Sequence, residues 1–537
     1  MSSSVRCVSL IGIDGQGIEI ETQIIGALKR FAIVGLPDGV LREAKDRVRC
    51  AIENSGFLFP HREVVVSLAP ASVPKTGSGF DLAIALSILA ADGQIDSAAL
   101  KEIVALGELG LDGSLRGTTT ALATAVYCRE RNLNYTGDQA ASLKLLTSDS
   151  DAKISSQVPD VSVIAVRNLF EAVAVLNAKA EPRILQGNAD SFIEFIDENH
   201  ELGFNDVVGQ DDAKRAFEVS AAGGHNLLMI GPPGAGKSML AKRMLSLLPP
   251  LNLQESIDVA RIYAALSTHN PKSKTLKNKL WRRRPFRSPH HSLSTAGLIG
   301  GGSHPKPGEI SMAHCGVLFL DEFAELRRDS LEALREPLET RCITISRAQL
   351  RVEFPANFIL VAAMNPCPCG KRLLGASATS PVHGQLSSIN GGIQSLQCRC
   401  SQGVIQRYIA RISGPIADRI DLKIWVPPVP VEDLQRVKEN TDLTEGMKKR
   451  VQRARIIQAT RFNSELVVNA QMGSEEIKKY CKLSKESQAL LSKASKRYQF
   501  SARGYTRVCK LARTIADLKG AENIEISHLS EALMYRM

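Results

Sequence analysis

Apolar residues recur along the chain with two different spacings, which separate an α/β part from a helical part. Short apolar runs such as EVVVSLA (63–69), NLLMI (226–230) and VLFL (317–320) have the length of buried strands, and each is followed by a helical pattern. Beyond residue 442, apolar residues return every three or four positions, as in DLTEGMKKRVQRARIIQATRF and GYTRVCKLARTIADLK. The pattern predicts an α/β fold that ends in a bundle of helices.

Changes in this pattern divide the chain into four parts. Residues 1–180 predict an α+β domain, 181–203 a linker without periodicity, 204–430 an α/β core, and 431–537 a helical domain, with the string PPVPVED (427–433) marking the boundary. The Ser/Gly-rich stretch at 375–395 predicts a flexible loop inside the core. A chain of 537 residues is long enough for this organisation.

A phosphate-binding loop follows the strand at 226–230. The loop has the spacing G-x-x-x-x-G-K-S and leads into a helical pattern, which is the strand–loop–helix context that a P-loop requires. Lys237 is predicted to reach the β and γ phosphates of ATP, and the Ser238 hydroxyl to ligate Mg²⁺. The predicted nucleotide-binding residues here are Gly231, Pro232, Pro233, Gly234, Ala235, Gly236, Lys237, Ser238 and Met239.

Two later strands end in polar residues that complete an ATP site. The strand VLFL is followed by Asp321, which is predicted to hold the magnesium ion, and Glu322, which is predicted to orient and polarise the attacking water. The strand in NFILVAAMN ends at Asn365, whose amide is placed to hydrogen-bond the γ-phosphate or the water. Together these motifs predict an ATPase.

These motifs, with FNDVVGQDDAKRAFEVSAAGG before them, resemble the AAA+ family, which implies a ring, usually a hexamer, with ATP bound between subunits. The resemblance implies that Val208 and Gly209 contact the adenine. It also implies that a neighbouring subunit supplies an arginine to the γ-phosphate, for which Arg419 fits better than Arg411. In the helical lid it offers Arg503 as the sensor arginine acting in cis, with Arg507 as the second choice.

Further segments are similar to the magnesium-chelatase-like branch of AAA+ proteins, and within it to the YifB/ComM family. They include RPFRSPHHSLSTAGLIGGGSHPKPGEISMAHCGVLFLDEFAEL, LAPASVPKTGSGFDLAIALSILAADGQI and GELGLDGSLRG, and the similarity covers nearly the whole chain. The resemblance implies a hexameric, ATP-driven DNA helicase that promotes branch migration during natural transformation. It also implies that an insertion between the two nucleotide motifs projects toward the pore of the ring.

That insertion is rich in positive charge. Residues 271–287 hold eight Lys/Arg and no acid, so phosphate binding is predicted for them, with stacking of bases on Phe286 or Trp281. The predicted DNA contacts are Arg282, Arg283, Arg284, Phe286 and Arg287. His290 and His291 follow Pro289 on a constrained turn, and either hydrogen-bond DNA or close the insertion against the ATPase core, the role that we favour.

The first domain resembles the Lon protease, a ribosomal-protein-S5-like fold, without its peptidase chemistry. A Lon-type peptidase needs a serine activated by a lysine. The loop PKTGSGFD places Gly79 at the position of the nucleophile, with Ser78 one position away, and GELGLDGSLRG places Leu122 at the position of the lysine. We therefore expect contacts with other subunits or with DNA rather than proteolysis.

Two cysteine pairs border the 375–395 stretch. Cys367 and Cys369, with Cys398 and Cys400, supply four thiolates that could enclose a structural Zn²⁺ and close the loop. The C-x-C spacing is less typical of zinc sites than C-x₂-C, so four reduced cysteines on a loop remain the alternative.

Charge and hydropathy suggest the partners and the compartment. The net charge of +11, with a second basic stretch of eleven Lys/Arg and one acid from Lys478 to Arg513, favours an anionic partner such as DNA. The longest apolar run, LAIALSILAA, is half of a membrane span, and the N-terminal residues lack the features of a signal peptide. We expect a cytoplasmic protein with no membrane partner.

The sequence therefore predicts a ring-forming ATPase that moves on single-stranded or branched DNA, with ATP and Mg²⁺ and a homo-hexameric assembly. Two alternatives stay open: the ATPase subunit of a metal-insertion complex such as magnesium chelatase, and an ATPase that remodels another polypeptide. The fused N-terminal domain and the basic stretches argue against the first alternative, and a pull-down on DNA and on protein would separate the second from a DNA motor.

Overall fold

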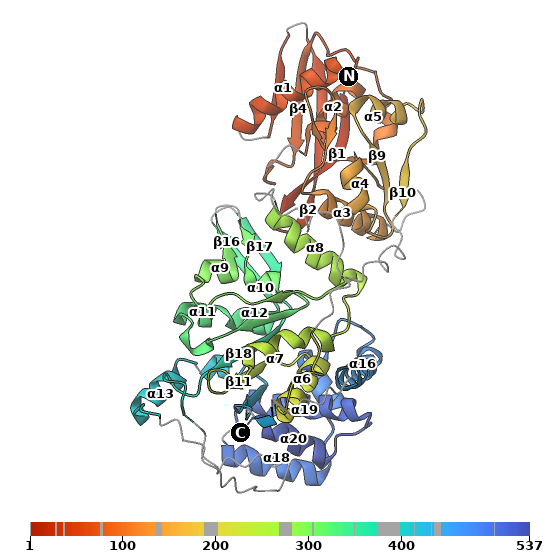
Figure 1. Cartoon of the computed structure of the whole chain (residues 1–537). Coiled ribbons are helices and arrows are strands. Elements are labelled where there is room, and N and C mark those ends of the chain that lie inside the picture. Colours follow the sequence, from red (N-terminus) through yellow and green to blue (C-terminus); the bar gives the residue numbers. More distant parts are fainter. Residues whose placement is uncertain are drawn as a thin grey trace.

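The computed structural model describes residues 2–26, 29–35, 38–75, 79–134, 142–186, 202–267, 282–302, 305–347, 350–372, 398–412, 414–430, 432–433, 442–498 and 500–536. It is elongated, with the N-terminal sheet at one end, the ATPase sheet in the middle and the last helices at the other end (Figure 1). The predicted fold class, α/β with a helical C-terminal part, is confirmed. Most of the predicted linker and all of 375–395 lie outside the described residues.

The N-terminal domain is built on a mixed sheet of eight strands in the order β10-β9-β8-β5-β1-β2-β4-β3. The strands are β1 (Ser2–Ile11), β2 (Asp14–Ile25), β3 (Phe31–Val34), β4 (Glu63–Ala69), β5 (Ile103–Ala105), β8 (Lys144–Ser148), β9 (Ser162–Val166) and β10 (Ile184–Gln186). Its helices are α1 (Asp38–Asn54), α2 (Asp81–Ala91), α3 (Ala121–Asn134), α4 (Asp149–Ser155) and α5 (Leu169–Leu176). Helix α2 is the longest apolar run, and it is buried along its whole length against β1 and β2.

A second sheet of five parallel strands carries the ATPase motifs. Its order is β12-β15-β18-β11-β19, with β11 (Leu227–Ile230), β12 (Phe286–Arg287), β15 (Val317–Leu320), β18 (Ile359–Met364) and β19 (Leu422–Trp425). Buried apolar side chains cover both faces of this sheet, as parallel sheets require. Because the strands are parallel, the segments that follow β11, β15 and β18 meet at one edge.

Helices surround this sheet on both sides. They are α6 (Asp211–Gly223), α7 (Lys237–Arg243), α8 (Leu253–Ser267), α9 (Thr295–Ile299), α10 (Glu309–Met312), α11 (Arg328–Ala333), α12 (Arg335–Thr340), α13 (Gln402–Ala410) and α14 (Gly414–Ala417). A hairpin of β16 (Cys342–Arg347) and β17 (Leu350–Pro355) lies beside them. The N-terminal domain docks here: Arg261 of α8 donates to the carbonyl of Ile13 at 3.2 Å and pairs with Asp14.

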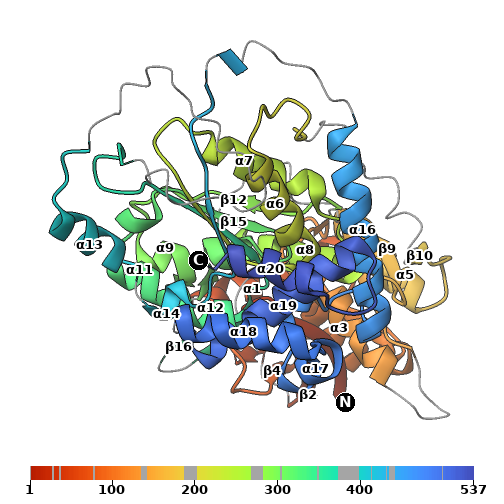
Figure 2. The ribbon, with the colours of Figure 1, turned by 90° about the horizontal axis from the view of Figure 1, so that it is seen from below.

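In the described residues, the lid contains the helices α16 (Leu443–Phe462), α17 (Ser474–Tyr480), α18 (Lys485–Tyr498), α19 (Ala502–Lys519) and α20 (Ile526–Met534). Helices α16 and α19 pack against α6, so the lid shares one apolar core with the ATPase sheet. Seen from the lid end, α17, α18, α19 and α20 lie grouped beneath the ATPase sheet (Figure 2).

Candidate functional site

The P-loop wraps the end of β11 and leads into α7. Gly234 and Gly236 have φ angles of +77° and +84°, a left-handed conformation that strains any residue with a Cβ atom. Lys237 is largely buried, and its Nζ donates to the carbonyls of Gly231 at 2.7 Å and Pro232 at 2.9 Å. Burial lowers the pKa of this ammonium group, while the nearby Asp321 carboxylate opposes the shift. The loop therefore holds a cation at the end of the strand.

The two residues predicted to hold magnesium face each other. Ser238 Oγ donates to Asp321 Oδ2 at 2.6 Å. Both are oxygen ligands of the kind that Mg²⁺ prefers, so this pair fits the ion. Asn365, which follows β18, accepts a 3.3 Å hydrogen bond from Lys237 Nζ through its Oδ1.

A single cavity joins the predicted ATP-site motifs. Its volume is about 800 Å³, and it is lined by residues 233–239, 288–291, 321–322 and 364–365. Lys237, Ser238, Asp321, Glu322 and Asn365, which span 129 positions of sequence, therefore share one space. The predicted adenine contacts, Val208 and Gly209, are not part of this lining, and they stay a prediction.

The same cavity contains a residue whose role the sequence left open. His291 Nδ1 lies 2.7 Å from Glu322 Oε2, and the two histidine rings lie 4.1 Å apart at their centroids. His290 Nδ1 is instead bonded to Ser292 Oγ at 2.8 Å. This contact with Glu322 corresponds to the closing role considered for the pair, since it ties the insertion to the predicted catalytic carboxylate. The one sequence signal for this contact is that His291 follows β12, the strand that pairs with β15, after which Glu322 lies.

Arg503, predicted to act in cis, pairs with a carboxylate away from the P-loop of its own chain, and its role stays a prediction. Arg503 and Arg419 both pair with Glu339, at 3.1 and 2.6 Å, and Arg507 pairs with Asp421 at 3.1 Å. This arginine cluster adjoins Asn226, the residue before β11, because the Asn226 amide donates to the Arg419 carbonyl at 3.0 Å. The P-loop begins after the other end of β11, about 13 Å of strand away.

Neither predicted trans arginine is placed at the nucleotide cavity of its own chain. Arg419 is buried, with a side-chain exposure of 4%, so a role in a neighbour's site requires it to leave Glu339. Arg411 is half exposed and pairs with Glu325 at 2.7 Å. Arg419 and Arg411 both stay predictions.

Part of the predicted DNA contact is used inside the protein. Arg284 donates to both carboxylate oxygens of Glu255 at 2.9 Å and to the Cys315 carbonyl at 2.7 Å. Arg287 makes two 2.7 Å hydrogen bonds to Glu309. Phe286 stacks on Phe319 of the central sheet at 6.2 Å. DNA binding by Arg284, Phe286 and Arg287 therefore does not fit this arrangement.

Two other arginines of the insertion remain candidates. Arg283 is exposed and Arg282 is half-buried, and both stay predicted DNA contacts. Trp281, the alternative stacking residue, lies outside the described residues.

The four paired cysteines converge. The sulfur atoms of Cys367, Cys369, Cys398 and Cys400 all lie within 4.8 Å of one another, and three of the separations are 3.3, 3.5 and 3.6 Å. Four thiolates around Zn²⁺, at about 2.3 Å from the metal, have sulfur separations of about 3.8 Å. The backbone N–H of Lys371 is the largest of the contacts that lower the pKa of Cys369 to about 6. The cluster fits a metal.

The N-terminal domain lacks the pair of groups that a Lon-type peptidase uses. Leu122 is buried in the apolar core, and an added Cβ at Gly79 would meet Leu106 at 3.2 Å. Ser78 lies outside the described residues. Within the described part of this domain, the residues at the two aligned positions carry no nucleophile and no base.

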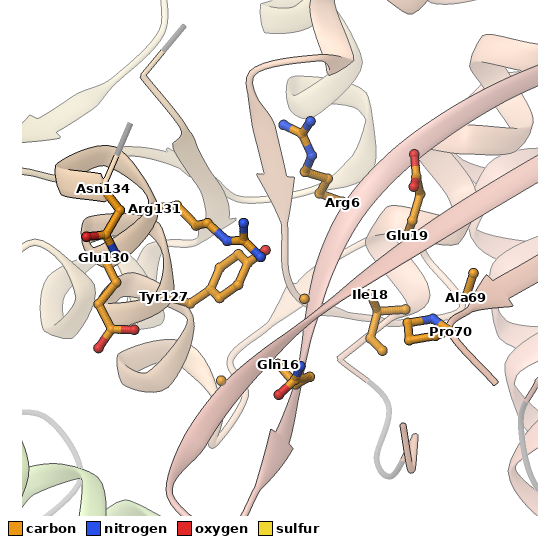
Figure 3. Close-up of a pocket in the computed structure, with 12 residues that line it drawn as sticks. Arg6, Gln16, Ile18, Glu19, Ala69, Pro70, Tyr127, Glu130, Arg131 and Asn134 are labelled. Carbon is orange, nitrogen blue, oxygen red and sulfur yellow. The ribbon is translucent and has the colours of Figure 1, made fainter. Parts of the chain in front are cut away.

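A second large cavity, of about 600 Å³, lies in the N-terminal domain between α3 and the β1–β2 hairpin (Figure 3). The Arg131 guanidinium lies 5.4 Å from the Tyr127 ring centroid, and Glu130 also lines the cavity. Across the cavity stand Arg6 and Glu19. Two cations and two carboxylates balance, so this cavity does not favour a polyanion such as DNA.

Comparisons with known proteins agree with this organisation. Three family models match: "Subunit ChlI of Mg-chelatase" at 20–136, "Magnesium chelatase, subunit ChlI" at 203–434, and "Magnesium chelatase, subunit ChlI C-terminal" at 441–536. The chain is 39% identical to the Competence protein ComM of Haemophilus influenzae, over 98% of this chain and 96% of that protein. It is 37% identical to YifB of Escherichia coli, over 99% and 97%.

A shorter similarity concerns a protease. The chain is 28% identical to Lon protease 2 of Bacillus subtilis, over 33% of each chain. Separately, no helix in the described residues is long and apolar enough to cross a membrane.

Proposed function

Since this chain belongs to the YifB/ComM family of magnesium-chelatase-like AAA+ ATPases, we propose that it is a ring-forming motor that hydrolyses ATP to move DNA. Its proposed task is branch migration during DNA uptake and recombination. The observation that carries the proposal is the convergence of the P-loop, Asp321, Glu322 and Asn365 on one cavity. The full-length similarity to a competence protein gives the proposed direction toward DNA.

Each part of the site has a separate proposed role in phosphoryl transfer. The P-loop backbone and Lys237 bind the phosphates, and Asn365 holds Lys237 in position. Ser238 and Asp321 would hold Mg²⁺, which would neutralise charge on the phosphates. Glu322 orients and activates the attacking water. In a ring, Arg419 and Arg503 lie together, away from their own P-loop, and we assign both to the nucleotide of a neighbouring subunit.

The link to DNA runs through the insertion. Arg283 is exposed, and eight residues later His291 meets Glu322. A phosphate bound at Arg282 or Arg283 can therefore influence the catalytic carboxylate through a short, Pro-containing segment. This proximity favours a motor whose hydrolysis responds to DNA.

The test is ATP turnover by the full chain, with and without single-stranded and branched DNA, at several salt concentrations. We expect stimulation by DNA that fades as salt rises, because phosphate contacts release counterions. Lys237→Ala should abolish turnover, and Glu322→Gln should bind ATP without hydrolysing it. ATP turnover that is the same with and without DNA would refute the proposal of a DNA motor.

The two rivals make different use of the same site. A chelatase-type or polypeptide-remodelling ATPase would hydrolyse ATP in the same cavity, but a protein partner and not DNA would stimulate its turnover. The balanced charges of the N-terminal cavity suit such a partner better than DNA. Turnover stimulated by protein and unaffected by DNA would favour this reading.

We also propose that the four-cysteine cluster holds a structural Zn²⁺. Purified protein should contain about one zinc per chain, and Cys398→Ser with Cys400→Ser should lose it and lower the Tm. Cys342→Ser, outside the cluster, is the matched control. A zinc content that is the same in the cluster variant and the control would reject the assignment.

A further inference from the structure

The lid carries a concentrated positive surface at the end of the molecule opposite the N-terminal domain (Figures 1 and 2). We call it the lid basic surface. Residues 478–498 contain seven Lys/Arg and one glutamate, so this short segment supplies six of the chain's eleven net positive charges. All seven basic side chains are exposed: Lys478, Lys479, Lys482, Lys485, Lys493, Lys496 and Arg497.

Helix α18 presents these charges on one side. Its buried residues, Ser487, Leu491 and Ala494, form one face, and α18 packs against α20. At 100° per residue, Lys485 and Lys496 point in nearly the same direction, away from that face, with Lys493 beside them. Lys485 and Lys496 are three turns apart, about 16 Å along the helix axis.

Carboxylates in the described part of the chain do not neutralise these charges. In the described residues, none of the seven basic side chains forms an ion pair with a carboxylate, and Glu486 is the one acid in the segment. Elsewhere in the lid, Arg461 and Arg513 both pair with the buried Asp517. An unpaired surface of one sign repels itself and attracts a polyanion.

Aromatic rings adjoin the charges at the end of α18. Tyr498 is exposed and stacks with Phe500 at 6.0 Å, and the Arg497 guanidinium lies 5.5 Å from the Tyr498 ring. Exposed rings beside backbone-binding cations are the combination that holds single strands, because each unpaired base offers a face for stacking.

We infer that the lid basic surface binds single-stranded DNA, through its phosphates along α18 and through a base stacked at Tyr498. The inference rests on the proposed function, and it adds a contact distinct from the insertion. It places a strand at the lid end of the molecule, where the strand enters or leaves the ring.

The test compares two triple variants of the full chain. Lys485→Gln, Lys493→Gln and Lys496→Gln remove three charges from the lid basic surface. Lys101→Gln, Lys153→Gln and Lys179→Gln remove three exposed charges from the N-terminal domain as the control. Binding of a labelled oligo-dT strand is measured by fluorescence anisotropy at several salt concentrations, and ATP turnover without DNA checks that both variants are folded.

The lid variant should lose roughly tenfold in affinity, and its log–log salt dependence should flatten by about 2, since each single-strand phosphate contact contributes about 0.7. The control should match the wild type. Tyr498→Ala should weaken binding of the single strand without changing the salt slope, and Tyr498→Phe, which keeps the ring, should bind as tightly as the wild type. An unaltered slope in the lid variant would overturn the inference, and equal losses on duplex DNA would overturn the single-strand assignment. Wild-type protein that binds no DNA would instead refute the proposed function.

Discussion

Two basic stretches of this chain look alike in sequence and differ in the structure. The insertion at 282–287 has four arginines, and the lid basic surface has seven Lys/Arg. In the insertion, Arg284 and Arg287 are bound to Glu255 and Glu309. On the lid basic surface, no basic side chain pairs with a described carboxylate.

The charge that a surface offers to a ligand therefore depends on how many of its basic side chains are paired, and not on how many it has. An arginine whose N–H groups are all engaged holds elements together, and it reaches a ligand only if those bonds break. A lysine without a partner costs the fold little and can release counterions when it meets a phosphate. The comparison separates residues that should change stability from residues that should change DNA binding.

The largest effect is expected at Arg284. Arg284→Ala leaves the buried Glu255 without its bidentate partner and removes the donor to two carbonyls, so a loss of about 3–5 kcal/mol is expected. Calorimetry should show a clear fall in Tm. Arg283→Ala, on the exposed neighbour, is the control and should lower the Tm much less. Equal Tm values for the two variants would remove the distinction between buried and exposed arginines.

A smaller loss is expected at Arg287. Its pair with Glu309 is partly exposed, so a double-mutant cycle of Arg287→Ala and Glu309→Ala should give a coupling of about 1–2 kcal/mol in the free energy of unfolding. Denaturant unfolding of the wild type, the two single variants and the double variant measures it. A coupling near zero would mean that Arg287 is free for another partner.

The nucleotide site could be predicted from sequence, whereas the partners of the arginines could not. The P-loop is a local strand–loop–helix pattern, and parallel strands bring Asp321 and Asn365 to the same edge wherever the rest of the chain lies. Glu255 lies 29 residues before Arg284 on a different element, and no spacing rule connects them. The position of Arg503 depends on how α19 packs against α6, which no pattern on α19 reveals.

The end of the insertion should influence hydrolysis. His291→Ala removes the contact that orients Glu322, so turnover should fall roughly tenfold, about 1.4 kcal/mol, with little change in KM. His291→Gln, which can still donate a hydrogen bond, should recover part of the rate. His290→Ala is the matched control, because His290 lines the same cavity but bonds Ser292. Equal rates for the two alanine variants would show that the contact has no role in hydrolysis.

The smallest expected effect is at Arg282 and Arg283, and it decides whether the insertion contacts DNA at all. The double change to Ala should lower the Tm far less than Arg284→Ala does, and it should flatten the salt dependence of single-strand binding by about 1.4, which is two phosphate contacts. Combined with the triple variant of the lid basic surface, the two reductions should add, since distant contacts are independent. A combined reduction no larger than that of the lid variant alone would mean that the insertion serves the ATPase core and that the lid is where DNA is held.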